Sequence, residues 1–122
     1  MSRILVCEDQ DSIRKMIEAL VKARGHEVCA VQSGAQALEE AVAKAPDIAL
    51  LDLTMPGDFD GFEVCRRLRS TKETEDIPII IVSALDDDIS RDRARECGAS
   101  AYFTKPFSPT KLLAAIQTHV RS

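Results

Sequence analysis

The sequence lacks the features that mark nucleic-acid-binding, membrane-spanning or secreted proteins. It has no block of lysine and arginine, and its formal net charge of −4 over 122 residues argues against a nucleic-acid-binding surface. No apolar run approaches the roughly 20 residues that a membrane-spanning helix needs. The first three residues lead directly into a strand-like segment, so we expect no secretory signal.

The chain also lacks any closely spaced pair of cysteines. Its four cysteines are spread along the sequence without a CxxC motif, at Cys7, Cys29, Cys65 and Cys97. Cys7 and Cys29 fall within strand-like runs, where a thiol packs as a small hydrophobe. We therefore expect reduced thiols, in preference to disulfides or a metal site, and a cytoplasmic protein.

No repeat, low-complexity segment or internal linker interrupts the sequence. With 45% hydrophobic and 30% charged residues, a chain of 122 residues has the composition of an ordinary globular protein. This length suits one domain with a real core rather than two. We therefore treat residues 1–122 as a single domain.

The most informative segment is the apolar run Ile48–Leu51, which leads directly into Asp52 and is followed by Pro56. A continuous apolar run of this length is typical of a strand buried on both faces in a parallel sheet. Asp52 would then lie at the carboxyl end of a central strand, where open α/β sheets bind their ligands. Taken alone, it could equally be an aspartate that begins a turn.

Strand-like and helix-like segments alternate along the whole chain. Strands are expected at 3–7, 27–31, 48–51, 77–83 and 101–104. Asp11 or Ser12, Ser33 and the aspartates at 86–88 are expected to cap three helices, and two more helices are expected to begin at Phe62 and at Ser108 or Pro109. This alternation predicts an α/β fold, a doubly wound parallel sheet with right-handed crossovers. The helix that ends near residue 97 has few apolar positions, so we expect it to be the most loosely held.

Polar side chains occur at the carboxyl ends of four expected strands. Glu8 and Asp9 follow the first, Asp52 the third, Ser83 ends the fourth and Lys105 follows the fifth. Separately, each has an ordinary explanation as a helix cap, a turn residue or a solvated loop residue. In a parallel sheet they converge, and crowded carboxylates repel unless a cation such as Mg²⁺ shares the site. An aspartate, Mg²⁺, a lysine and a hydroxyl together form a phosphoryl-acceptor site.

These residues and their spacing resemble the response-regulator receiver domains of two-component signalling, of the chemotaxis type with a flavodoxin-like fold. The matching segments are residues 6–9, 50–56, 60–61, 81–84, 98–99 and 102–106, so the resemblance extends from Arg3 to Val120. It implies a five-stranded parallel sheet of order 2-1-3-4-5 flanked by five helices.

The resemblance implies a role for each acidic residue. Asp52 would accept a phosphoryl group from the phosphohistidine of a sensor histidine kinase or of a histidine phosphotransfer protein. Asp9, Asp52 and the backbone carbonyl of Thr54 would bind Mg²⁺ directly, and Glu8 would hold a metal-bound water. The protein would be a signalling switch that dephosphorylates itself slowly, not an enzyme that turns over free substrates.

The resemblance also implies how phosphorylation is detected. Lys105 would pair with the phosphoryl group, Ser83 would move to bond it, and Tyr102 would be the aromatic switch that follows Ser83. The bond from Lys105 to Pro106 would be cis. The helix near residues 88–97, the strand 101–104 and the C-terminal helix would form the surface read by an output domain, a partner protein or a second copy in a phosphorylation-dependent homodimer.

Two features depart from the usual family pattern. Gln10 stands where many members have a third acidic residue, which would slightly weaken metal binding. Residues 57–59 make the loop after Pro56 one residue longer than usual, which would alter dephosphorylation or kinase docking. Neither change removes a required chemical group.

Three other readings are weaker. A haloacid-dehalogenase-like phosphatase would need an acid at the position of Thr54. A flavodoxin would need a phosphate-binding loop after the first strand, where this chain is acidic. The main alternative is a degenerate receiver that acts as a phosphorylation-independent protein-binding module. Such domains typically lose the acceptor, the acidic pair or the lysine, and all of these are present here.

Overall fold

Five parallel strands form a central sheet between two layers of helices. The computed structural model describes residues 2–55, 57 and 59–120, and the sheet order is β2-β1-β3-β4-β5, as predicted. The strands are β1 (Arg3–Cys7), β2 (Glu27–Val31), β3 (Ile48–Leu51), β4 (Ile79–Ser83) and β5 (Ala101–Thr104). The helices are α1 (Asp11–Lys22), α2 (Gly34–Lys44), α3 (Gly61–Ser70), α4 (Asp88–Glu96) and α5 (Pro109–His119).

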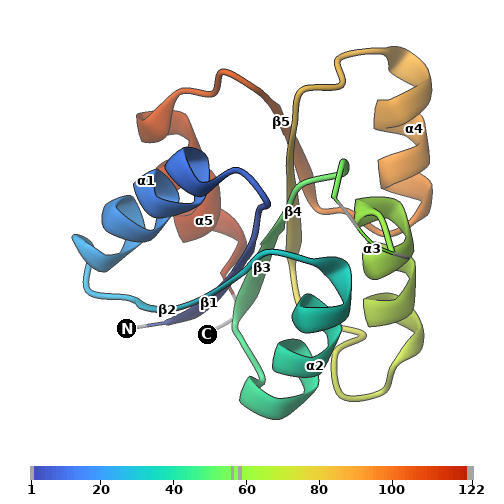
Figure 1. Ribbon diagram of the computed structural model, residues 1–122, viewed down its shortest axis with the longest axis horizontal. Coiled ribbons are helices and arrows are strands. Elements are labelled where there is room, and N and C mark those ends of the chain that lie inside the picture. The colour runs from blue at the N-terminus through green and yellow to red at the C-terminus, as the bar shows by residue number, and fades with distance from the viewer. Residues whose placement is uncertain (1, 56, 58, 121–122) are drawn as a thin grey trace.

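The side chains of each strand alternate between two hydrophobic cores. In β1, Ile4 and Val6 face the core beneath α1 and α5, whereas Leu5 and Cys7 face the core beneath α2, α3 and α4. Figure 1 shows α1 and α5 on one side of the sheet and α2, α3 and α4 on the other. Because both faces are covered, β1, β3 and β4 are almost wholly apolar and buried, which is the pattern that predicted a parallel sheet.

Side-chain caps fix the starts of four helices. Ser33, Asp60, Asp87 and Ser108 each accept a hydrogen bond from the backbone N–H three residues further on. Each cap satisfies one of the N–H groups that lack a partner in the first turn of a helix. The predicted caps at Ser33 and within the acidic run before α4 are confirmed, and α5 begins at Pro109, one of its two predicted starts.

Other boundary predictions were wrong. We expected Asp11 or Ser12 to cap α1, but Asp11 is already helical and Gln10 is the cap residue, without a side-chain bond. The fourth strand begins at Ile79 rather than Ile77, because the N–H of Ile77 bonds the carbonyl of Thr74 and Pro78 has no N–H to donate to the sheet. The third helix starts one residue before Phe62.

Two apolar positions that fit the helical pattern are exposed. Met16 of α1 is 42% exposed and Val42 of α2 is 52% exposed.

All four cysteines are free thiols, as predicted; Cys7 and Cys65 are buried, and Cys29 and Cys97 are half-buried. No helix among the described residues is both long and apolar enough to cross a membrane. Pro56, where a break is predicted, and Asp58 in the lengthened loop lie outside the described residues.

Candidate functional site

The carboxyl ends of β1, β3, β4 and β5 bring the predicted site residues together. The backbone N–H of Asp52 bonds the carbonyl of Cys7 at 3.0 Å, and that of Lys105 bonds the carbonyl of Ser83 at 2.8 Å. These bonds fix the ends of neighbouring strands in register, so their polar side chains converge at one edge of the sheet. A cleft of about 190 Å³ opens there, lined by Asp9, Gln10, Asp52, Thr54, Ala84 and Lys105.

Asp52 is held at both carboxylate oxygens. Its Oδ2 lies 3.1 Å from Lys105 Nζ, and its Oδ1 accepts a hydrogen bond of 3.2 Å from the backbone N–H of Thr54. The residue is only 4% exposed. A nearly buried carboxylate is stable only when it is paired, and this one has a cation on one oxygen and an amide on the other.

Three acidic side chains crowd this edge of the sheet. Carboxylate oxygens of Glu8, Asp9 and Asp52 lie within 4.8 Å of one another. Lys105 contacts two of these acids, with Nζ 2.7 Å from Glu8 Oε1 and 3.1 Å from Asp52 Oδ2. One lysine cannot balance three carboxylates, so the group retains excess negative charge directed at the cleft. Oxygen ligands in this arrangement fit Mg²⁺.

The pKa values of Glu8 and Lys105 are both raised, but for different reasons. Burial raises the pKa of Glu8 to about 7, although the hydrogen bond with Lys105 lowers it. Burial also works against the charge of Lys105, but Glu8 and Asp52 outweigh it and raise the pKa of the lysine. Lys105 therefore stays protonated at neutral pH, and Glu8 is the group that titrates there.

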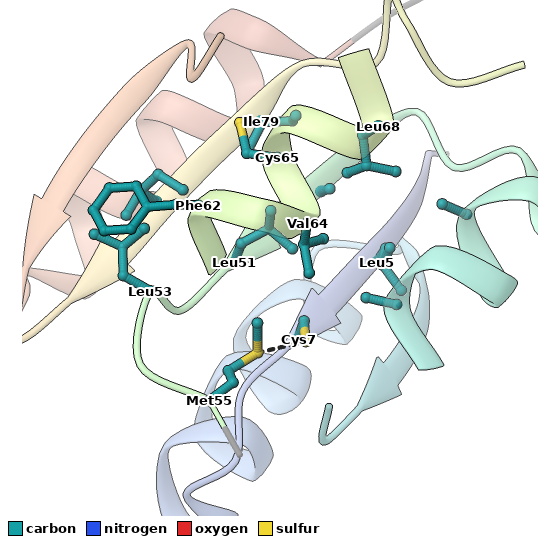
Figure 2. Close-up of a cluster of buried hydrophobic side chains, with 14 of the residues drawn as sticks. Leu5, Cys7, Leu51, Leu53, Met55, Phe62, Val64, Cys65, Leu68 and Ile79 are labelled. Atoms are coloured by element: carbon teal, nitrogen blue, oxygen red, sulfur yellow. Dashed lines mark hydrogen bonds between the residues drawn. The ribbon is translucent and has the colours of Figure 1, made fainter. Parts of the chain in front are cut away.

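Cys7 and Met55 contact each other in the hydrophobic core next to the site. Met55 comes directly after Thr54, and its Sδ lies 2.9 Å from Cys7 Sγ at the end of β1. Figure 2 shows Met55 directed at Cys7, beneath the cluster that α3 covers. This contact joins the backbone before the Glu8–Asp9 pair to the backbone after Asp52.

Ser83 and Tyr102 both form hydrogen bonds with the backbone of Leu85. Ser83 Oγ accepts a hydrogen bond of 3.1 Å from the N–H of Leu85, and the Tyr102 hydroxyl donates one of 2.7 Å to its carbonyl. Ser83 is fully buried, whereas Leu85 is 37% exposed. The sequence did not point to Leu85, because it contributes backbone groups and its side chain carries no signal.

Gly61 is a second residue that the strand-end pattern missed. A Cβ on Gly61 would lie 2.2 Å from the carbonyl oxygen of Asp52, and the N–H of Gly61 bonds the carbonyl of Leu53 at 2.9 Å. The first turn of α3 therefore passes against the backbone of Asp52, and only glycine leaves enough room. The pair Asp60-Gly61 was noted in the sequence, but the steric reason is visible only in the structure. The predicted cis bond between Lys105 and Pro106 is present.

Comparison with known proteins agrees with this geometry. The chain is 39% identical over 120 residues to the response regulator PleD of Caulobacter vibrioides, covering 98% of this chain and 26% of PleD. The chemotaxis protein CheY4 of Vibrio cholerae has a TM-score of 0.92 and 28% identity, covering 98% of this chain and 99% of that one. The receiver domain of the sensor histidine kinase PA1611 of Pseudomonas aeruginosa has a TM-score of 0.90 and 29% identity, covering 99% and 98% of the two chains.

The PA1611 structure holds a magnesium ion coordinated in its active-site cleft. The chain spans 26% to 52% of the length of the curated relatives PleD, AfsQ1 of Streptomyces coelicolor and PhoB of Pseudomonas aeruginosa. The model of the family described as response regulator receiver domain matches residues 4–117, which is nearly the whole described chain. This chain therefore belongs to the response regulator receiver domain family of two-component signalling.

Proposed function

We propose that Asp52 accepts a phosphoryl group from the phosphohistidine of a sensor histidine kinase or of a histidine phosphotransfer protein, in a reaction that requires Mg²⁺. One observation carries this proposal: the nearly buried Asp52 carboxylate lies at the cleft, held by Lys105 and by the Thr54 N–H, beside two further acids. Receiver domains are signalling switches that interact with histidine kinases and output domains. This arrangement supplies the groups that such a switch needs.

The residues present fit a magnesium ion. Asp9, Asp52 and the carbonyl of Thr54 would bind it directly, and Glu8 would hold one of its waters. The excess charge of three carboxylates over one lysine supports this assignment. When bound, Mg²⁺ offsets the charge of the carboxylates and of the incoming phosphoryl oxygens.

In the transfer step, a carboxylate oxygen of Asp52 attacks phosphorus. A P–O bond forms as the P–N bond to the donor imidazole breaks, and the departing imidazole takes up a proton. Lys105 lies 3.1 Å from an oxygen of Asp52, so its ammonium group is near the charge that develops on the phosphoryl oxygens. Water later hydrolyses the acyl phosphate, which releases inorganic phosphate and returns Asp52 to its free carboxylate.

We further propose that Ser83 transmits the change to the surface formed by α4, β5 and α5. Its Oγ accepts a bond from the N–H of Leu85, and the hydroxyl carries one proton that it can donate to a phosphoryl oxygen. Movement of Ser83 would pull on Leu85, and Leu85 also holds the Tyr102 hydroxyl. An output domain, a partner protein or a second copy of the chain would recognise the changed surface.

The weak anchoring of α4 supports this readout. Within α4, Ala94 is the buried residue, and Ile89 is 78% exposed. A helix with so small a packed face has little tertiary stabilisation. A charge-assisted hydrogen bond is worth about 1.5–3 kcal/mol, enough to shift such an element.

The acceptor is tested by incubating the protein with Mg²⁺ and acetyl phosphate. The intact mass should increase by one phosphoryl group, and hydroxylamine should remove it, as expected of an acyl phosphate. Asp52→Asn should not be modified, whereas the exposed control Asp76→Asn should behave as the wild type. Stoichiometric modification of Asp52→Asn would show that the acceptor is another residue. Full partner binding by Asp52→Asn would instead favour the phosphorylation-independent binding module.

The readout is tested by amide hydrogen exchange with and without beryllofluoride, a phosphoryl mimic. Exchange should change in residues 84–107. A change confined to the segment between Thr54 and Gly61 would contradict the proposed transmission through Leu85.

A further inference from the structure

Arg14 is a buried cation close to the acidic site. It belongs to the face of α1 that packs on the sheet, together with Ile17 and Val21, and only 8% of its surface is exposed. Arginine is almost never buried without partners, because removing its charge from water is costly. The contacts of its guanidinium group therefore indicate its role.

The guanidinium group bridges the backbone of the acidic pair and a surface carboxylate. Nη1 of Arg14 donates a hydrogen bond of 3.1 Å to the carbonyl oxygen of Glu8, and Nη2 pairs with the carboxylate of Asp11. The carbonyl of Glu8 belongs to the peptide bond that joins Glu8 to Asp9. The arginine thus holds the peptide group between the two acidic side chains.

This peptide needs such support because it lies just beyond the end of β1. The N–H of Glu8 still bonds the carbonyl of Val31 in β2 at 3.1 Å, but the strand ends at Cys7. On the far side, the Glu8 carboxylate accepts a bond from the N–H of Gln10. Asp9 is exposed, so the direction of its carboxylate depends on the backbone that carries it.

Charge alone would give Arg14 the opposite effect on a bound cation. An unbalanced guanidinium beside three carboxylates would compete with Mg²⁺, so that removing it would tighten metal binding. However, Arg14 is paired with Asp11, whose side chain is 71% exposed. The pair is formally neutral, and the donor nearer the site contacts an uncharged carbonyl. The geometry therefore points to orientation rather than charge.

We propose that Arg14 is a positioning residue for metal binding: its planar guanidinium group, neutralised by Asp11, fixes the Glu8–Asp9 peptide so that the Asp9 carboxylate faces that of Asp52. The proposal rests on the proposed function, since it assumes that Mg²⁺ binds at these acids. Groups that orient metal ligands typically change metal affinity by about 10- to 100-fold when removed.

The test measures Mg²⁺ binding by calorimetry, without any activity assay. The double variant Asp11→Asn/Arg14→Met removes the bridge, leaves the net charge of the chain unchanged and keeps an apolar stem in the buried space. Its dissociation constant for Mg²⁺ should rise about tenfold. The control Arg24→Met removes an exposed arginine at the end of the same helix region and should bind like the wild type.

A second variant covers the case in which the double variant does not fold. Arg14→Lys keeps the charge and the stem but cannot donate two bonds from one planar group. It should weaken Mg²⁺ binding by at least threefold. Wild-type affinity in either folded variant would overturn the proposal.

A second measurement separates positioning from a general structural role. The phosphorylation rate with acetyl phosphate is measured against Mg²⁺ concentration. For a positioning residue, the Mg²⁺ concentration at half-maximal rate rises and the plateau rate is kept; for a structural role, the plateau falls and the half-maximal concentration stays. If the wild type itself binds no Mg²⁺, the proposed function fails. If the wild type binds Mg²⁺ and the variants match it, only the role of Arg14 fails.

Discussion

The ionisation of Glu8 makes the metal-free domain less stable as pH rises towards neutrality. Burial raises the pKa of Glu8 from 4.5 to about 7 in the folded domain. Because the folded state binds this proton more tightly than the unfolded chain does, its contribution to stability is complete below pH 4.5 and is lost as pH rises through 7. At about 1.4 kcal/mol for each tenfold change in proton affinity, the loss amounts to about 3 kcal/mol.

Glu8→Gln isolates this effect. Glutamine has the shape of a protonated glutamate, and its amide oxygen can still accept a bond from Lys105, which lies 2.7 Å from Glu8 in the wild type. The variant should therefore lack the decline. Its free energy of unfolding relative to the wild type should rise by about 3 kcal/mol between pH 4.5 and pH 7.5.

The assay is urea unfolding in the presence of EDTA at pH values from 4.5 to 8. Taking the difference between variant and wild type removes the contribution of titrating groups that do not interact with Glu8. The exposed control Glu73→Gln should give a difference that does not vary with pH. Parallel curves for Glu8→Gln and the wild type would refute the assignment of the slope to Glu8.

Three further predictions concern other parts of the site. Gly61→Ala places a Cβ 2.2 Å from the carbonyl oxygen of Asp52, so it should cost about 1–3 kcal/mol in urea unfolding and slow phosphorylation; unchanged values would contradict the steric argument. Asp9→Ala should weaken Mg²⁺ binding by calorimetry while stabilising the metal-free domain, and unchanged affinity would remove Asp9 from the ligands. Tyr102→Phe loses the 2.7 Å hydrogen bond to the carbonyl of Leu85, so amide exchange near Leu85 should become faster. Phosphorylation of Asp52 should be unchanged in this variant.

The sequence predicted the sheet and the convergence of the site because both depend on strong local signals. The apolar runs of β1, β3 and β4 are buried on both faces, which allows few folds. In a parallel sheet, the position of Asp52 or Lys105 after a strand already specifies the edge on which it lies. Neither inference required knowledge of side-chain conformations.

The sequence could not predict contacts made through the backbone. Leu85 joins Ser83 to Tyr102 with its own N–H and carbonyl, so its side chain gives no sign of this role. Arg14 lies on the apolar face of α1, where a charged residue could have been noticed, but its bond to the carbonyl of Glu8 depends on the tertiary fold. The start of α1 was misplaced for a related reason: Asp11, which looked like a cap, is paired with Arg14 instead.

The distribution of burial explains how a rigid site and a movable surface coexist in one small domain. Ser83 ends β4, which is buried throughout, whereas Leu85, two residues later, is 37% exposed. Beyond it, the buried residue of α4 is Ala94, whose methyl group is worth about 0.8 kcal/mol, whereas α3 buries several side chains worth about 1.5–3 kcal/mol each. The boundary between strong and weak anchoring therefore falls between Ser83 and Leu85. A bond formed at Ser83 acts at this boundary, so α4 is the element that it can shift at the least cost in packing.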